Sequence, residues 1–399
     1  MRKLSVRDLD VSGKRVFVRV DYNVPLDRTG SRSTVTDDRR IKESLPTLRS
    51  ILERGGSIVA ASHLGRPKGK PDPAHSMAPV ARRLEEVLGS PVKFAADSAG
   101  PLASEAARQL RAGEVLLLEN LRFQKEEEAD DAGFAEALAS LADLYVNDAF
   151  GSAHRAHASV HAMARRFNRP AAGLLMEKEL VSLGRLLDEP ARPFAVVVGG
   201  AKVSDKIDLL DHLIARCNAL LIGGAMAYTF LKALGHEAGE SLVEASREGA
   251  ARDLMTLAAV KGVSLLLPED HMEAKAGTRE KGRPTGGPDV SAGYVALDIG
   301  PRTVAAFTRE IGKARTVLWN GPMGKFEDPS FAAGTQAVAR AIASSSGFTV
   351  VGGGDSAAAL KAFKMESGFS HISTGGGASL EFLSGKTLPG VAALTDVTL

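Results

Sequence analysis

Arginine and histidine residues stand directly after short apolar runs in the first half of this chain, in the segments 19–23, 62–66, 119–122 and 151–155. An arginine guanidinium donates two parallel hydrogen bonds to a phosphate or a carboxylate, so these clusters indicate a site for a compact anion. A single arginine is more often a solvated surface charge, but a chance distribution would place most of these residues on helix faces. The candidate ligands are Arg40, Arg66, Arg122 and Arg155, with His63, His154, Asp21 and Asn23 as further hydrogen-bonding groups.

In the second half of the chain, the corresponding clusters contain glycine together with lysine, asparagine or aspartate. The segments are 199–202, 320–322, 352–356 and 375–377. Glycine lets a phosphate approach the backbone, and the free N–H groups at the start of a following helix bind anions. We therefore expect a nucleotide to bind this half of the chain through its phosphates.

Three charged residues near these segments have candidate roles. Asp355 is a candidate Mg²⁺ ligand, because Mg²⁺ takes one or two carboxylates together with substrate phosphates. A cap on the following helix is an equally good interpretation of Asp355. Lys202 and Lys206 are four residues apart and would project from one face of a helix start, where an anion would relieve their repulsion. Alternatively, the negative charges of Asp205 and Asp208 would offset the repulsion between the two lysines.

The second half contains no Gly-x-x-x-x-Gly-Lys-Ser/Thr pattern, so the chain is not a P-loop enzyme. Residues 352–357 do match a relaxed dinucleotide fingerprint, Gly-x-Gly-x-x-Ala. This match leaves a dinucleotide-dependent dehydrogenase as one alternative. It lies too near the C-terminus to open a full dinucleotide-binding domain, and it leaves the arginines of the first half unexplained.

The overall composition is that of a globular protein. The 399 residues are 44% hydrophobic and 25% charged, which suggests two or three domains. Because 50 Lys and Arg nearly balance 48 Asp and Glu, no global charge favours nucleic acid or a membrane. The single cysteine, Cys217, excludes an intramolecular disulfide and is typical of a reducing compartment. Without a signal peptide or an apolar run of ~18 residues, we expect a cytoplasmic protein.

Short β-branched runs alternate along the chain with segments of helical periodicity. Such alternation is typical of parallel sheets covered by helices on both faces. We predict an α/β fold of two doubly wound parallel-sheet (Rossmann-like) domains, joined by a connecting helix within residues 172–192. Strands are predicted at 15–20, 57–61, 92–95, 115–118, 144–146, 194–198, 219–222, 264–267, 316–319, 348–351 and 371–373, and helices at 41–54, 80–88, 132–141 and 331–344.

Seven segments resemble those of phosphoglycerate kinases, in the same order and over essentially the whole chain. They are residues 19–25, 62–67, 119–123, 148–151, 199–203, 319–322 and 352–355. The resemblance implies the glycolytic reaction 1,3-bisphosphoglycerate + ADP ⇌ 3-phosphoglycerate + ATP, with Mg²⁺ as cofactor. It also implies a monomer whose partners are these small molecules, without nucleic acid or membrane.

The resemblance further implies a division of the chain and of the site. Residues 1–171 would form the substrate domain, to which 389–399 return, 172–192 the hinge, and 193–388 the nucleotide domain. The glycerate would be held by Asp21, Asn23, Arg40, His63, Leu64, Gly65, Arg66, Arg122 and Arg155. The nucleotide would be held by Lys202, Lys206, Gly223, Gly224, Ala296, Asn320, Glu327, Gly353, Gly354, Asp355 and Ser356, with Asp355 on the metal.

Some positions depart from the usual family pattern. Arg39 is an extra arginine before the expected one, and residues 28–33 resemble a short insertion. Ala296 replaces a common glycine, Lys325 replaces an apolar residue, and Glu269 stands where valine is more frequent. None of these positions is expected to carry the chemistry.

The resemblance implies catalysis by positioning and charge neutralisation, because a carboxylate nucleophile needs no general base. Arg40, Lys202 and Lys206 would surround the transferred phosphoryl group. Since the two substrates would bind different domains, we expect closure about the connecting helix. A non-catalytic nucleotide-binding protein of the same architecture is the second alternative, and it would bind nucleotide without turnover.

Overall fold

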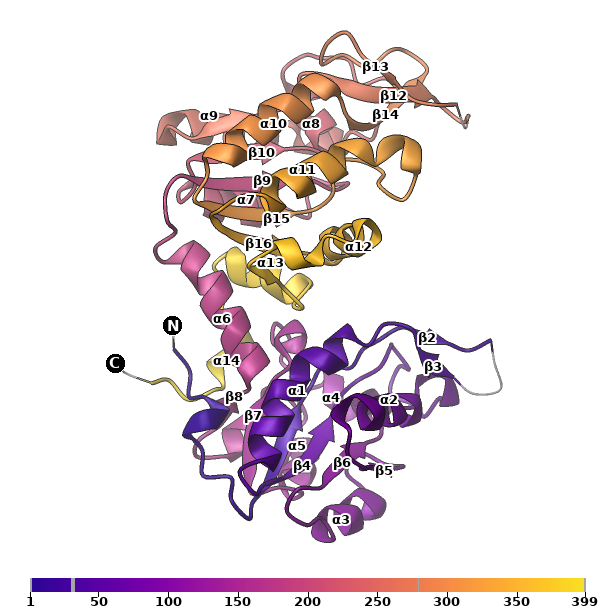
Figure 1. Ribbon diagram of the computed structural model, residues 1–399, viewed down its shortest axis with the longest axis vertical. Helices are drawn as coiled ribbons and strands as arrows, with labels where there is room; N and C mark the ends of the chain where they lie inside the picture. Colours follow the sequence, from indigo (N-terminus) through magenta and orange to yellow (C-terminus); the bar gives the residue numbers. More distant parts are fainter. Residues whose placement is uncertain (1, 30–32, 279, 398–399) are drawn as a thin grey trace. The chain divides into compact units, whose positions relative to one another are not determined.

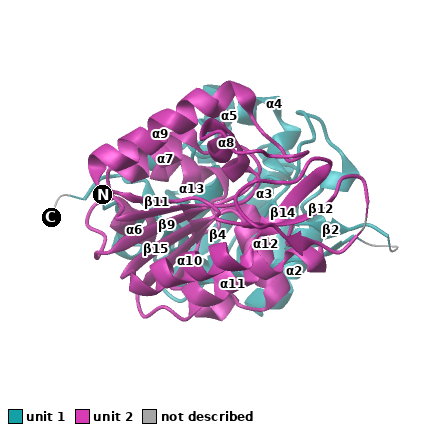
Figure 2. Ribbon diagram, turned by 90° about the horizontal axis from the view of Figure 1, so that it is seen from above, with its two compact units in different colours: residues 1–181, 387–399 teal, residues 182–386 magenta. Residues whose placement is uncertain are grey.

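The computed structural model describes residues 2–29, 33–278 and 280–397. The chain divides into two compact units, which Figure 2 colours separately: residues 1–181 with 387–399 form unit 1, and residues 182–386 form unit 2. Parts of the segments 28–33 and 275–288, and the last two residues of the chain, lie outside the described residues.

Unit 1 is built on a six-stranded sheet in which every pair of neighbouring strands is parallel. This arrangement confirms the predicted parallel sheet. The chain adds strands on one side of β1 and then on the other, which is the doubly wound order. The strands, in spatial order, are β5 (Val92–Ala95), β6 (Val115–Leu118), β4 (Ser57–Ala61), β1 (Arg15–Arg19), β7 (Leu144–Asn147) and β8 (Ala171–Ala172). A separate hairpin pairs β2 (Leu26–Asp27) with β3 (Thr34–Val35).

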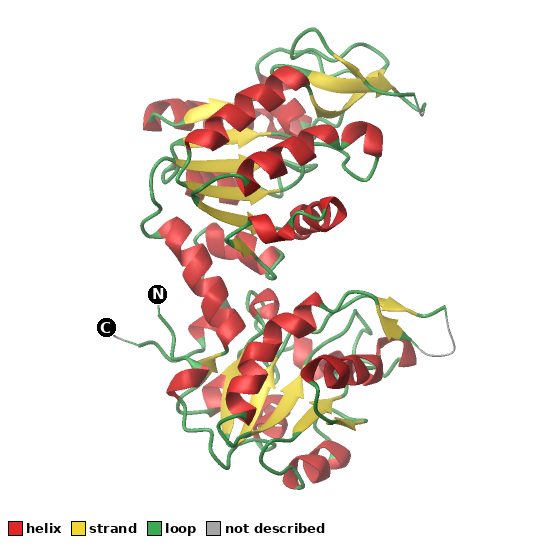
Figure 3. Ribbon diagram, viewed as in Figure 1, coloured by secondary structure: helices red, strands yellow, loops and turns green. Residues whose placement is uncertain are grey.

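Helices pack against this sheet because each presents an apolar stripe to it. Figures 1 and 3 show the strands as a layer between helices. In α1 (Arg39–Leu52), the buried residues Ile41, Leu45, Leu48 and Ile51 recur at helical spacing and join the core formed with β1 and β4. The other helices of unit 1 are α2 (Ala78–Leu88), α3 (Pro101–Arg108), α4 (Lys125–Glu128), α5 (Ala132–Ala139) and α14 (Pro389–Ala392), and α6 (Leu174–Leu187) begins in unit 1.

Unit 2 repeats this architecture with a second six-stranded parallel sheet. A three-stranded antiparallel sheet of β13 (Arg283–Pro284), β12 (His271–Lys275) and β14 (Tyr294–Ile299) is attached to the unit. The parallel strands, in spatial order, are β11 (Ser264–Leu266), β10 (Ala219–Ile222), β9 (Phe194–Val198), β15 (Thr316–Asn320), β16 (Phe348–Gly352) and β17 (His371–Ile372).

The helices of unit 2 cover both faces of its parallel sheet (Figure 1). Phe307 and Ile311 of α10 (Pro301–Lys313) and Val338 of α11 (Ala333–Ala343) share one core with the strand residue Trp319. The other face carries α7 (Ile207–Ile214), α8 (Met226–Ala233), α9 (Glu248–Lys261) and α13 (Gly377–Leu383), and α12 (Gly354–Phe363) follows β16.

Two charged segments form short elements of secondary structure. The segment 275–288 contains the exposed strand β13, in which Arg283 forms an ion pair with the buried Glu273 of β12 at 3.0 Å. The run of three glutamates after Lys125 lies in the short helix α4, and its Glu127 is fully buried.

Cys217 is buried and free, and burial raises the pKa of its thiol to about 12. It therefore packs as a small apolar residue. Within the described residues, no helix has the length and apolar character needed to cross a membrane.

Candidate active site

The parallel strands of unit 1 end together at one edge of the sheet. Arg19 at the end of β1 pairs in register with Ala61 at the end of β4 and with Asn147 at the end of β7. The loops that follow these strands therefore begin side by side, and this edge is where ligands bind in open α/β sheets. Most of the arginines and histidines noted in the sequence lie on these loops.

Arg40 is tied directly to the loop after β1 and, through Asn23, to the loop after β4. Its Nη1 donates to Asp21 Oδ1 at 2.9 Å, and Nη1 lies 3.5 Å from the carbonyl oxygen of Asn23. The Asn23 side-chain oxygen accepts from the backbone N–H of Gly65 at 2.9 Å. Burial works against ionisation of Asp21, but the Arg40 guanidinium holds the pKa of Asp21 below its usual value. The start of α1 and the loops after β1 and β4 are thus joined into one polar network.

Arg122 is held more deeply than the other candidate arginines. Its Nη1 donates to the carbonyl oxygen of Gly65 at 2.9 Å, and its Nε lies 3.2 Å from Glu128 Oε1 without forming a hydrogen bond. Burial and the neighbouring cations Arg155 and Arg19 lower the pKa of Arg122, against the opposing charge of Glu128. A buried guanidinium with an N–H group that makes no hydrogen bond, crowded by other cations, is a favourable partner for an anion.

Arg66 and Arg155 have exposed side chains in the loops after β4 and β7. The Nε of Arg155 lies 3.1 Å from the Nε2 of His154. Neither arginine forms an ion pair with an acid in the described part of the chain. Their positive charges are therefore not neutralised locally.

The side chain of His63 is buried. Its ring contacts Arg19, a residue that was not predicted from the sequence as part of the site. The Nη2 of Arg19 lies 3.2 Å from the Nδ1 of His63. An arginine can only donate, so Nδ1 accepts and the ring proton is on Nε2. Burial and the cations Arg19, Arg122 and Arg40 lower the pKa of His63 well below its usual value, despite the opposing charge of Asp21. His63 is therefore a neutral N–H donor.

Arg19 is only 1% exposed and needs compensation for its buried charge. Its Nε donates to Ser159 Oγ at 2.8 Å, and Ser159 Oγ donates to Glu127 Oε1 at 2.5 Å. Glu127 also accepts from the backbone N–H of Ser159 at 2.9 Å. In the sequence, Arg19 was noted only as the first residue of the segments 19–23 and 19–25, and no local pattern linked it to Glu127.

Asn120 is a second supporting residue that the sequence-based site did not include. It is fully buried, and its Oδ1 accepts from the backbone N–H groups of Leu64 and Arg122 at 3.2 and 3.0 Å. Its Nδ2 donates to the carbonyl oxygens of Leu64 and His75 at 2.7 and 2.9 Å. One amide thus fixes the loop after β4 relative to the loop after β6.

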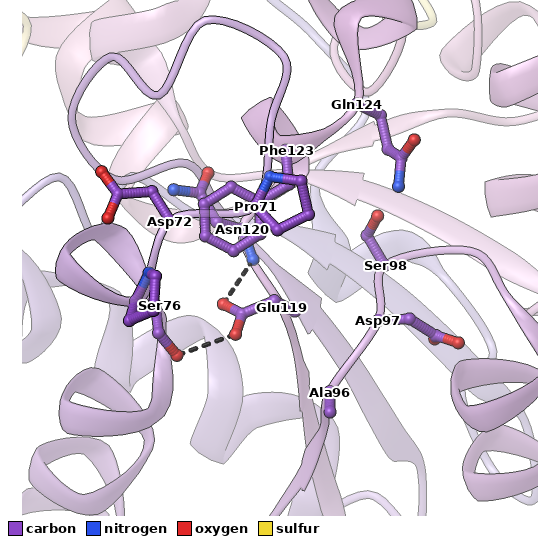
Figure 4. Close-up of a pocket in the computed structure, with 11 residues that line it drawn as sticks. Pro71, Asp72, Ser76, Ala96, Asp97, Ser98, Glu119, Asn120, Phe123 and Gln124 are labelled. Atoms are coloured by element: carbon purple, nitrogen blue, oxygen red, sulfur yellow. Dashed lines mark hydrogen bonds between the residues drawn. The ribbon is translucent and has the colours of Figure 1, made fainter.

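A pocket of about 430 Å³ lies at the ends of β5 and β6, with Asn120 in its wall (Figure 4). Its carboxylates are already engaged with helix starts. Glu119 accepts from the N–H of Met77 at 2.7 Å, just before α2, and Asp97 accepts from the N–H of Ala103 in α3 at 2.7 Å. None of the candidate arginines lines this pocket. We interpret it as structural support for the anion-binding edge.

The strands of unit 2 also end together at one edge. Asn320 at the end of β15 pairs in register with Val198 of β9 and Gly352 of β16. The strand order reverses between β9 and β15, and such a reversal creates a crevice at the carboxyl ends of the strands. The segments that begin at this edge contain the glycines, Lys202 and Asp355 identified from the sequence.

Two of these glycines are required by close backbone packing. A Cβ on Gly199 would lie 2.1 Å from the carbonyl oxygen of Pro322, and a Cβ on Gly224 would lie 2.5 Å from the backbone nitrogen of Gly200. Gly224 also has a φ of +65°, which side chains rarely adopt. The loops after β9, β10 and β15 can therefore approach one another only with glycine at these positions.

Lys206 and Asn320 meet at this edge, where Lys206 Nζ donates to Asn320 Oδ1. Burial lowers the pKa of Lys206 to about 8, against the opposing charges of Asp355 and Asp205. The Nδ2 of Asn320 is buried and has no hydrogen-bond partner. A partly desolvated ammonium and an unused N–H donor side by side suit an anionic oxygen.

The expectation for the two lysines needs a correction. Helix α7 begins at Ile207, so Lys202 lies in the loop after β9 and Lys206 is the residue that precedes the helix. The two side chains therefore do not project from one helical face. The sequence pattern placed the helix start too early because the loop after β9 runs for several residues before helical geometry begins.

The loop after β16 enters α12 at Gly354. Asp355 is therefore in the first helical turn, where its side chain forms no cap hydrogen bond, so the capping interpretation is wrong. Asp355 is exposed, as is Glu327, and the hydroxyl of Ser356 accepts from the N–H of Gly321 at 2.6 Å. Ala296 is buried in β14, and its N–H donates to Ser241 Oγ at 3.0 Å.

Comparison with known proteins agrees with this geometry. The phosphoglycerate kinase family matches residues 6–386. A phosphoglycerate kinase of Koribacter versatilis is 54% identical over 99% of this chain and all of its own length, and one from Acidobacterium capsulatum is 53% identical over the same shares. The phosphoglycerate kinase structure from Coxiella burnetii is 38% identical with a TM-score of 0.88, and that from Pyrococcus horikoshii is 33% identical with a TM-score of 0.85. Each structure is matched over 98% of both chains.

Two doubly wound units, one with a cationic edge and one with a glycine-lined edge, define a two-domain phosphotransferase that uses a nucleotide. The chain belongs to the phosphoglycerate kinase family. Phosphotransferases of this family use a carboxyl group as acceptor, so the dinucleotide-dependent dehydrogenase considered from the sequence is not favoured.

The neutral state of His63 is directly testable. Because burial and three neighbouring arginines lower its pKa, we expect His63 to remain neutral through the pH range around 6.5 in which an ordinary histidine titrates, with its proton on Nε2. Nitrogen-15 NMR of the ligand-free protein, labelled at histidine, measures both the charge and the tautomer. A titration of His63 with a midpoint in that range, or a proton on Nδ1, would contradict the arrangement.

Proposed function

We propose that this chain catalyses the reversible transfer of a phosphoryl group between 1,3-bisphosphoglycerate and ADP, with 3-phosphoglycerate and ATP as products. The observation that carries the proposal is the buried Arg122, whose charge is crowded by other cations at the carboxyl edge of the sheet of unit 1. Such a group favours an anionic substrate, and family membership supplies the identity of that substrate.

In unit 1, the proposed ligands divide by the kind of group that they offer. Arg66 and Arg155, exposed and without acidic partners among the described residues, suit the phosphate of the glycerate. Arg40 and the neutral N–H of His63 suit its carboxylate and hydroxyl oxygens, together with Asp21 and Asn23. Arg122 and the backbone of Leu64 and Gly65 complete the site.

In unit 2, backbone N–H groups and two lysines would receive the nucleotide phosphates. Gly353 directly precedes α12, and Gly354 and Ser356 lie in its first turn, whose free N–H groups favour phosphate. Lys202, Lys206 and Asn320 would contact the transferred phosphoryl group. Gly223, Gly224, Ala296 and Glu327 would border the nucleoside.

The donor set in unit 2 fits a Mg²⁺ ion that arrives with the nucleotide. Asp355 is an exposed carboxylate at a helix start, and no cluster of three or more His, Cys, Asp or Glu side chains that could hold a metal occurs among the described residues. Mg²⁺ commonly takes one or two carboxylates and completes its coordination with phosphates and water. When bound at Asp355, the ion would neutralise charge on the nucleotide phosphates.

The proposed chemistry uses position and charge. The carboxylate of 3-phosphoglycerate would attack the terminal phosphoryl group of ATP in line, forming one P–O bond while the bond to ADP breaks. A carboxylate is already deprotonated, so no side chain has to remove a proton. Arg40 from unit 1 and Lys202 and Lys206 from unit 2 would stabilise the equatorial oxygens, which requires the units to close and thereby exclude water.

We further propose that the protein acts as a cytoplasmic monomer on small molecules, without nucleic acid or a membrane as partner. The near balance of acidic and basic residues and the single buried cysteine support this proposal. The proposed domains are 1–171 with 389–399, a hinge over 172–192, and 193–388.

A coupled assay with 3-phosphoglycerate and Mg-ATP tests the function directly. We expect turnover that requires both substrates and Mg²⁺. Nucleotide binding without turnover would instead support a non-catalytic protein of the same architecture. Binding of a nicotinamide coenzyme would support the dehydrogenase.

Arg40→Ala is expected to lower kcat by roughly 10³–10⁵-fold, as the loss of an arginine that stabilises a phosphoryl transition state does. Arg39→Ala is the matched control, because Arg39 is the adjacent residue in α1 and is not assigned to the site. We expect Arg39→Ala to retain near-normal kcat. A folded Arg40→Ala protein with less than about a tenfold loss, or a larger loss in Arg39→Ala, would refute the assignment of Arg40.

The pKa of Lys206 predicts a pH dependence for nucleotide use. Because the ammonium form is required and burial lowers the pKa of Lys206 to about 8, kcat/KM for Mg-ATP should fall as pH rises through about 8. Lys206→Arg should retain its own kcat/KM to higher pH, since arginine stays charged, although its absolute rate will be lower. The same alkaline fall in both proteins would show that another group causes it.

A further inference from the structure

The first turn of α6 obtains its hydrogen-bond acceptors from two other elements. The N–H of Leu174 donates to Thr47 Oγ1 of α1 at 2.8 Å. The N–H groups of Leu175 and Met176 donate to Asp148 Oδ1 at 2.9 and 3.1 Å. The first N–H groups of a helix have no partner within the helix, and a nearby residue usually caps them. Here α1 and the loop after β7 supply the caps.

The joint between these elements is buried and closely packed. Thr47 and Asp148 are both fully buried. A Cβ on Gly173 would lie 2.1 Å from Asp148 Oδ1, so only glycine fits at the residue before α6. The N–H of Asp148 donates to the carbonyl oxygen of Arg19 at 2.8 Å, which fixes Asp148 to β1.

Capping α6 with Asp148 buries a carboxylate, which has a free-energy cost that a neutral cap would avoid. Burial raises the pKa of Asp148 to about 6, although Thr47 and the two N–H groups favour its charged form. Its second oxygen, Oδ2, is buried and has no hydrogen-bond partner. A neutral cap would provide acceptors for these N–H groups without burying a carboxylate.

Helix α1 links this joint to the anion-binding edge. Arg40 is in its first turn, and Thr47 lies about two turns further along the same helix. Between them, Ser44 Oγ lies 2.7 Å from the hydroxyl of Tyr22, which is in the loop after β1. The element that carries a proposed catalytic arginine is therefore the element that caps α6.

Helix α6 is also the segment in which the chain passes from unit 1 to unit 2, since unit 1 ends at Val181 and unit 2 begins at Ser182. We propose that Thr47 and Asp148 are positioning residues for phosphoryl transfer, which fix the start of α6 to α1 so that turnover depends on them while glycerate binding does not. The inference rests on the proposed function and names residues through which the two units would act together.

The test compares Thr47→Val with Thr47→Ser. Valine has nearly the shape of threonine but cannot accept from Leu174, whereas serine keeps the hydroxyl. An unsatisfied buried N–H destabilises the first turn, so we expect Thr47→Val to lower kcat roughly tenfold, with KM for 3-phosphoglycerate within about twofold of wild type. Thr47→Ser should stay within about twofold of wild type in both constants. Thermal unfolding, followed by circular dichroism, confirms that each variant is folded at the assay temperature.

The outcomes separate this inference from the proposed function. Wild-type protein without turnover would refute the function itself. With an active wild type, a folded Thr47→Val protein with unchanged kcat would show that the joint is only structural. A raised KM with unchanged kcat would show that Thr47 acts on glycerate binding. Either result would overturn the inference.

If Thr47→Val does not fold, two further measurements decide the question. Asp148→Asn keeps one side-chain oxygen as acceptor but removes the charge, and the same loss of kcat at unchanged KM is expected. In the wild type, hydrogen exchange at Leu174, Leu175 and Met176 should be slow, both in the free protein and with both substrates bound. Fast exchange at these amides in the free protein would overturn the inference whatever the variants do.

Discussion

Parallel pairing in register is the constraint on which both candidate sites depend. In each unit, the central strands end at the same level, so the residues that follow them meet although they are far apart in the sequence. A one-residue shift of β1 against β4 would move the loop of Asp21 away from that of His63 and would turn the side chains of β1 to the opposite face. The chemistry of each unit thus rests on the backbone hydrogen bonds of its sheet.

The two edges use this constraint in different ways. In unit 1, side-chain cations gather at the edge, and the buried Glu127 behind them keeps Arg19 in place through Ser159, while Arg66 and Arg155 have no acidic partner among the described residues. In unit 2, glycines bring three loops close together, and a few donors such as Lys206 and Asn320 stand among exposed backbone groups. The first edge suits a small, highly charged substrate, whereas the second suits phosphates whose oxygens are spread along a chain.

The sequence was sufficient to predict the parallel sheets, the approximate strands and most of the residues at the two edges. Each of these depends on a local pattern, such as an apolar run followed by arginine or glycine. Arg19, Asn120 and Asp148 were not identified as part of the site, because their roles depend on partners that are distant in the sequence. The start of α7 was misplaced for a related reason: Lys202 and Lys206 have helical spacing, but the helix begins only at Ile207, after a loop whose Gly199 packs closely against Pro322.

The central claim is that the cationic edge of unit 1 receives the glycerate and the glycine-lined edge of unit 2 receives the nucleotide. Amide NMR shifts, measured during separate titrations with 3-phosphoglycerate and with Mg-ADP, test it most directly. We expect 3-phosphoglycerate to shift the loops after β1, β4 and β6, and Mg-ADP to shift those after β9, β15 and β16. If both ligands shifted the same unit, or if each shifted the opposite one, the assignment of the two edges would be contradicted.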